Sequence, residues 1–69
     1  MVIKFLLENG YIELAKLLKA TGVCLSGGMA KIAISEGKVR VDGLVEFRRG
    51  RKIRRGQKVE FEESTIEAE

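Results

Sequence analysis

The 69-residue chain contains no histidine and no tryptophan, and it has only one cysteine and one aspartate. A metal site needs a cluster of His, Cys or carboxylate ligands, and no such cluster is visible in the sequence. A triad-type nucleophile would lack its usual imidazole base. Paired glutamates could act as acid and base, but most of them fall within residues 60–69, where nothing predicts a fixed geometry. We therefore expect no catalysis, no metal and no cofactor.

Long apolar runs are also missing. None approaches the roughly 18 residues that a membrane span needs, and Val2–Leu7 is too short for the hydrophobic region of a secretory signal. A single cysteine cannot form an internal disulfide, which is typical of a reducing cytosol. A chain of this length forms one domain that buries only about 60% of its unfolded surface. We expect a small cytoplasmic protein, monomeric and without membrane contact.

Positive charge is concentrated in one segment of the chain. Residues 48–58 carry seven cations and no acid: Arg48, Arg49, Arg51, Lys52, Arg54, Arg55 and Lys58. Residues 1–59 hold all 13 basic groups against five acids, whereas residues 60–69 hold five acids and no base. A cluster this dense repels itself and suits a polyanion, because neutralising phosphates releases condensed counterions. The alternative is a solvated, charged loop that aids solubility.

A short strand and a helix are predicted at the start of the chain. Val2–Leu7 is apolar and precedes a turn signal at Glu8-Asn9-Gly10. In Tyr11–Ala20 apolar residues recur at helical spacing, and Gly22 follows at the position of a helix-ending glycine.

A second helix is predicted over Gly27–Glu36. Ser26 is a good N-terminal cap, and Gly37 is suited to end the helix. We expect the connector Val23–Leu25 to lie beneath the two helices, with Cys24 as a small buried side chain.

The period then changes to two, which predicts short strands. Lys38–Val41 leads into the hairpin signal Asp42-Gly43. A two-residue turn would pair Val39 with Glu46, an unfavourable match, so we favour a three-residue loop with a bulge. That register places four apolar residues on one face: Val39, Val41, Val45 and Phe47.

The last predicted strand is Lys58–Phe61, after a turn at Arg55-Gly56-Gln57. We expect one domain over residues 1–63 and an acidic tail over residues 64–69. The fold class is α+β, with two helices packed on a small, mostly antiparallel sheet.

Residues 14–59 resemble the S-four-type RNA-binding domain, also called the alpha-L RNA-binding motif. The matching positions are Leu14, Leu18, Gly22, Val23, Ser26, Ala30, Lys31, Ile34, Gly37, Val39, Val41, Gly43, Gly56 and Val59. The length of the chain is similar to that of the stand-alone bacterial YbcJ-like branch. The resemblance implies binding of structured RNA, ribosomal or transfer RNA, at the start of the second helix and the hairpin after it. It points to Ser26, Lys31, Gly43 and the flanks of the hairpin.

Three departures from the family pattern accompany this resemblance. Gly27 stands where the family usually has Arg, and Asp42 stands where it often has Asn. Glu13-Leu14-Ala15 replaces the common Arg-Leu-Asp. These changes suggest that binding has moved toward Arg48–Arg55.

We therefore expect a non-catalytic RNA-binding module that is accessory to translation or ribosome assembly, with the ribosome as a possible partner. The candidate RNA-binding residues are Ser26, Gly27, Lys31, Lys38, Arg40, Gly43, Arg48, Arg49, Arg51, Lys52, Arg54 and Arg55. The aromatics are all expected at core-like positions, so we expect recognition of phosphates and shape rather than base stacking. Two alternatives are an adaptor whose basic loop docks an acidic protein, and a peripheral binder of anionic membrane. The missing amphipathic basic helix argues against the membrane binder.

Overall fold

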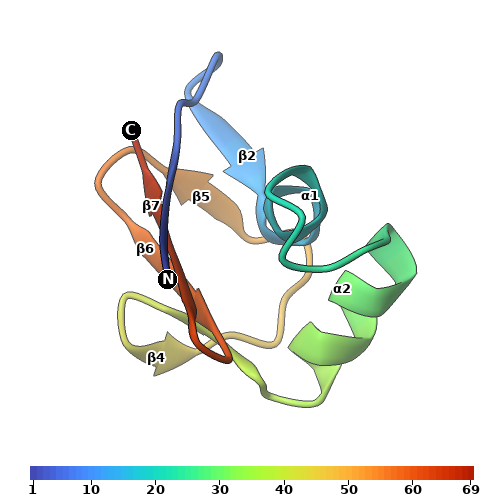
Figure 1. Ribbon diagram of the computed structural model, residues 1–69. Coiled ribbons are helices and arrows are strands. Elements are labelled where there is room, and N and C mark those ends of the chain that lie inside the picture. Colours follow the sequence, from blue (N-terminus) through green and yellow to red (C-terminus); the bar gives the residue numbers. More distant parts are fainter.

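Two helices pack together on one side of a set of short strands (Figure 1). The computed structural model describes all 69 residues. The elements are β1 (Val2–Phe5), β2 (Tyr11–Glu13), α1 (Leu14–Ala20), α2 (Gly27–Ser35), β3 (Val39–Val41), β4 (Leu44–Val45), β5 (Lys52–Arg54), β6 (Lys58–Phe61) and β7 (Ser64–Ala68). This architecture confirms the predicted α+β class.

The strands form two separate sheets. The larger has the order β1-β7-β6-β3-β4, and the smaller is the ribbon β2-β5. All pairs are antiparallel except β1 with β7, in which Val2 is paired with Thr65 and Phe5 with Ala68. The sheet is therefore mostly antiparallel, as expected, but the first and last strands are parallel neighbours.

The signals at the helix ends are confirmed. The Ser26 hydroxyl oxygen accepts a hydrogen bond of 3.1 Å from the Met29 N–H, as expected for an N-terminal cap. Gly22 and Gly37 follow the helices with φ of 80° and 75°, a conformation that glycine adopts without steric cost.

The predicted start of the first helix at Tyr11 is wrong. Residues 11–13 form β2, which pairs with β5, and the helix begins at Leu14. The Leu14 N–H donates to the Arg51 carbonyl (2.8 Å) and the Ala15 N–H to the Arg49 carbonyl (3.0 Å). The loop after β4 thus satisfies amides of the first helical turn.

The predicted register of the hairpin is also wrong. Asp42 and Gly43 form a two-residue turn, both with positive φ, and Arg40 is paired with Val45. The Glu46 N–H then donates to the Val39 carbonyl (3.0 Å). This pairing looked unfavourable because it buries Glu46, yet two arginines neutralise the carboxylate.

As a consequence of this register, Val45 and Phe47 do not join the core. Val45 is 43% exposed and Phe47 is 64% exposed, and both side chains lie near Gly37.

Residues 64–69 are not a tail outside the domain. Ser64–Ala68 forms β7, which lies between β1 and β6 in the larger sheet (Figure 1). Ile66 and Ala68 are buried, while Glu67 lies 3.9 Å from the Lys58 ammonium on the neighbouring strand. The prediction failed because it rested on the acidic composition of these residues. It overlooked that Ile66 and Ala68 are separated by one charged residue, which is the period of a strand.

The core lies between the helices and the strands. Its largest fully buried side chains come from most elements: Leu14, Leu17, Leu18, Ile34, Val39, Ile53, Val59 and Ile66. Cys24 is buried among them, as predicted, and burial together with the charge of Glu62 raises the pKa of its thiol. None of the helices is long and apolar enough to cross a membrane.

Candidate nucleic-acid interface

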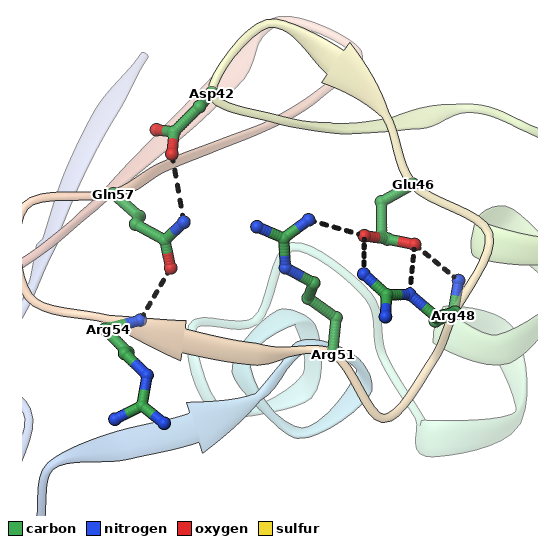
Figure 2. A network of polar contacts seen from close by, with 6 residues as sticks. All are labelled: Asp42, Glu46, Arg48, Arg51, Arg54 and Gln57. Carbon is green, nitrogen blue, oxygen red and sulfur yellow. Dashed lines mark hydrogen bonds and ion pairs between the residues drawn. The ribbon is translucent and has the colours of Figure 1, made fainter.

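The loop between β4 and β5 is held by a network around Glu46 (Figure 2). The Glu46 carboxylate accepts hydrogen bonds from the Arg48 N–H (3.0 Å), from the Arg48 guanidinium (3.1 and 3.2 Å) and from Arg51 Nη1 (2.7 Å). Together with the two carbonyl groups that cap α1, this network fixes the loop at both ends. Residues 48–51 are therefore a structured part of the surface.

The same network gives two cations of the predicted site an acidic partner within the fold. The pKa of Glu46 is lowered to about 2, mainly by hydrogen bonds from Arg48 and then Arg51, despite the opposing effect of desolvation. The pKa of Arg48 is raised by the same carboxylate. Arg48 and Arg51 thus already have an anionic partner, and at least part of the basic run serves the fold.

Three cations from different elements line one surface hollow. Lys16 of α1, Lys31 of α2 and Arg49 of the loop surround a depression of about 310 Å³, together with Glu13, Ala15 and Gly50. We call this depression the basic hollow. Lys31 and Arg49 form no ion pair, whereas Lys16 Nζ lies 3.2 Å from a carboxylate oxygen of Glu13.

The basic hollow joins the two regions that the sequence suggested separately. Lys31 was carried over from the family, and Arg49 belongs to the basic run. Lys16 was missed, because on the outer face of a helix a single lysine is an ordinary solvated residue. The only signal for it was its position on the first turn of α1, next to the loop that caps that helix.

A second hollow also borders Gly50. It has a volume of about 460 Å³ and is lined by Arg48, Gly50, Arg51 and Lys52. Since Gly50 borders both hollows, they are neighbours, and the positive surface continues from Arg49 to Lys52.

On the β2-β5 ribbon, two predicted cations flank an aromatic ring. Lys52 Nζ lies 4.8 Å, and the guanidinium carbon of Arg54 5.7 Å, from the centre of the Tyr11 ring. Tyr11 is 43% exposed, so its expected place at the core is wrong. Arg55 follows, exposed and without an ion pair, in the turn before β6.

At the start of α2 the backbone is not covered by side chains. No atom lies within 4 Å of the position that a Gly27 side chain would occupy. The Ser26 hydroxyl is engaged by the Met29 N–H, so its role is to cap the helix. The absence of side chains at Gly27 and Gly28 leaves first-turn amides approachable by an anion.

The remaining predicted residues are not brought to the basic hollow. Lys38 Nζ is 3.1 Å from Oε1 of Glu36. Lys38 also lines a different hollow, together with Met29 and Phe61. Arg40 projects from β3, between Val45 and Glu60 of the neighbouring strands.

The hairpin turn has a structural role. Gly43 supplies a φ of 85°. Asp42 accepts a hydrogen bond of 3.0 Å from the Lys58 N–H, and another of 3.0 Å from the Gln57 side chain (Figure 2). These bonds lower the pKa of Asp42. Gln57 in turn accepts from the Arg54 N–H (2.9 Å), so this aspartate ties two turns together.

Two curated proteins are similar to this chain in sequence. The chain is 52% identical over 54 residues to the putative RNA-binding protein YbcJ of Escherichia coli, covering 78% of this chain and 77% of that protein. It is 43% identical over 56 residues to the probable ribosome maturation protein RlbA of Bacillus subtilis, covering 81% and 79%.

The fold is also found in a solved structure. The solution structure of YbcJ from E. coli, described as revealing an alfaL motif involved in RNA-binding, matches with a TM-score of 0.69 and 42% identity over 97% of this chain and 84% of that chain. The model of the S4 domain family matches residues 5–69, which include β7. The chain therefore belongs to the S4 domain family.

Proposed function

We propose that this protein is a non-catalytic RNA-binding module, and that the basic hollow is the centre of its RNA-binding surface. The observation that carries the proposal is the convergence of Lys16, Lys31 and Arg49 from three separate elements. Like charges gathered in this way repel one another, so the arrangement is best explained by an anionic ligand. Membership of the S4 domain family and the printed names of the relatives support RNA as that ligand.

In this proposal the cations that have no acidic partner bind phosphates. Lys31 acts as a point charge, and the planar guanidinium of Arg49 holds a phosphate with two parallel hydrogen bonds. The bare amides at Gly27 and Gly28 offer further donors at the positive end of α2. Arg48 and Arg51 instead position the loop through Glu46.

The RNA that we propose is folded, and either ribosomal or transfer RNA. Cations on a loop fixed at both ends suit a ligand with a fixed arrangement of phosphates. The name of the B. subtilis relative, a probable ribosome maturation protein, supports a role in ribosome assembly or translation. Such a role would place the protein in the cytoplasm.

The first test compares two variants that each lose two positive charges. We expect Lys31→Ala/Arg49→Ala to weaken RNA binding more than Lys38→Ala/Arg40→Ala, whose side chains lie elsewhere. For the wild type, log K against log salt should have a slope of about −3 to −5, and each lost phosphate contact should reduce the slope by roughly 0.7 to 0.9. Equal losses in both variants would mean that only the net charge matters.

The second test separates specific recognition from simple attraction. Arg49→Lys/Arg54→Lys/Arg55→Lys keeps the net charge and leaves the arginines that bind Glu46 intact. We expect this variant to lose roughly 1–3 kcal/mol of preference for folded target RNA over random RNA, because lysine cannot form the bidentate contact or stack. Equally strong binding of polyglutamate and RNA by the wild type would favour an adaptor for acidic proteins instead.

A further inference from the structure

The ring of Tyr11 is held on the outer face of the β2-β5 ribbon. In this ribbon Tyr11 is paired with Arg54, and Ile12 with Ile53. Ile53 is fully buried, so alternation places Tyr11, Lys52 and Arg54 together on the opposite, outward face. Both cations lie within the roughly 6 Å at which a cation is attracted to an aromatic ring. We call these three side chains the tyrosine platform.

The tyrosine platform continues into the basic hollow. A depression of about 480 Å³ beside the ring is lined by Asn9, Tyr11, Ile12, Glu13 and Lys16. Glu13 and Lys16 also line the basic hollow. The depression beside Tyr11 and the basic hollow therefore share two lining residues and adjoin on the surface.

The Tyr11 ring is also exposed enough for a nucleobase to stack on it. Phe5 and Phe61 are partly buried and pack against the core, whereas Tyr11 is 43% exposed. An aromatic ring with two cations close to it, next to the proposed phosphate site, has the composition of surfaces that bind single-stranded nucleic acid.

Building on the proposed function, we infer that the tyrosine platform binds one unpaired nucleobase of the RNA whose phosphates occupy the basic hollow. The base stacks on the exposed part of the Tyr11 ring, and Lys52 and Arg54 face the phosphates that flank it. Because every base has a π-face, the platform selects unpaired over paired nucleotides and does not select a sequence.

Tyr11 itself reports on this site. It is the only tyrosine and the chain has no tryptophan, so the tyrosine fluorescence of the protein comes from the platform. We would titrate the wild-type protein with a short single-stranded oligoribonucleotide and with an abasic ribose-phosphate chain of the same length. Anisotropy of a dye on each chain measures binding independently of the tyrosine signal.

We expect both chains to bind and only the base-containing chain to quench Tyr11, with the same concentration dependence as its anisotropy. Binding of the oligoribonucleotide without quenching, or equal quenching by the abasic chain, would overturn the stacking site and leave the proposed function intact. Absence of binding by any RNA, including folded RNA, would overturn both.

Variants at this position give a second measurement. We expect Tyr11→Leu to weaken binding of the single-stranded chain by roughly five- to a hundredfold, the range found for base–aromatic stacking, and to leave binding of the abasic chain unchanged. Tyr11→Phe, which keeps the ring, should bind both chains like the wild type. An equal loss by Tyr11→Leu on both chains would show that Tyr11 only supports the fold of the ribbon.

Discussion

Nη1 of Arg51 lies 2.7 Å from Oε1 of Glu46, and this contact joins the end of the β3–β4 hairpin to the start of β5. Glu46 is only 8% exposed, which makes it the one charged residue in the buried set. A buried carboxylate needs a charged and hydrogen-bonded partner. The register of the β3–β4 hairpin and the position of the loop between β4 and β5 are thus determined together.

We expect the Glu46 network to make stability depend on pH. The pKa of Glu46 in the folded state is about 2, below its ordinary value of 4.5. The stabilisation is therefore complete above pH 4.5 and is lost as the pH falls from there toward 2. Glu46→Gln should lower the free energy of unfolding by about 1–3 kcal/mol at neutral pH, and the difference from the wild type should shrink across that window in urea titrations.

Glu36→Gln is the matched control, because Glu36 is exposed and its carboxylate forms an ion pair only with the exposed Lys38. Exposed ion pairs contribute about 0–1 kcal/mol, so this variant should follow the wild type. A constant difference between wild type and Glu46→Gln from pH 7 down to about pH 2 would exclude the carboxylate as the cause.

Removal of residues 64–69 should unfold the domain. This truncation deletes β7, which is hydrogen-bonded to both β1 and β6, and it removes the buried side chains of Ile66 and Ala68. Ile66→Ala alone should cost about 2–5 kcal/mol, seen as a large fall in melting temperature by circular dichroism. Glu67→Gln, which keeps the strand and removes only charge, should melt close to the wild type. A truncated chain with the wild-type melting curve would contradict this role for β7.

Gly37→Ala and Gly43→Ala should differ in their effects on stability. Both glycines have positive φ, 75° and 85°, so both variants carry the backbone cost of about 1–2 kcal/mol. A new Cβ at Gly37 would lie 3.3 Å from the Phe47 ring, whereas nothing lies within 4 Å at Gly43. We expect the greater loss in free energy of unfolding for Gly37→Ala. Combining it with Phe47→Ala should remove the excess, and a persistent excess would rule out the ring contact.

Cys24 should react slowly with thiol reagents in the native protein. The side chain is 4% exposed, and burial raises the pKa of the thiol, which lowers the fraction of reactive thiolate. In urea the same thiol should react at the rate of an ordinary cysteine, so the ratio of the two rates measures the opening of the core. Similar rates in the two conditions would show that the connector between the helices is open in the folded state.

Features fixed by neighbouring residues could be predicted from the sequence. The cap at Ser26 and the helix ends at Gly22 and Gly37 depend on local backbone geometry, and all three are confirmed. The position of the hairpin turn at Asp42-Gly43 was also predicted, although the loop length and the register that follows it were wrong.

Features fixed by distant partners could not be predicted. Residues 11–13 have a helical pattern, but they are drawn into β2 by pairing with β5, some forty residues later in the chain. Burial of Glu46 is tolerated because Arg48 and Arg51 pair with it, and both looked like free cations in the sequence. The candidate site was affected in the same way: Arg49 and Lys31 were found, but Lys16 and the exposure of Tyr11 follow from packing that no local pattern reports.

The parallel pairing of β1 with β7 has a consequence for how the domain is made. During synthesis β1 emerges first, yet its neighbour in the sheet begins at Ser64. Closing a loop of that length costs conformational entropy before any contact of β1 repays it. Until β7 has left the ribosome, β1 has no partner strand and one edge of β6 is unpaired, so we expect the nascent domain to remain open and to close in one late step.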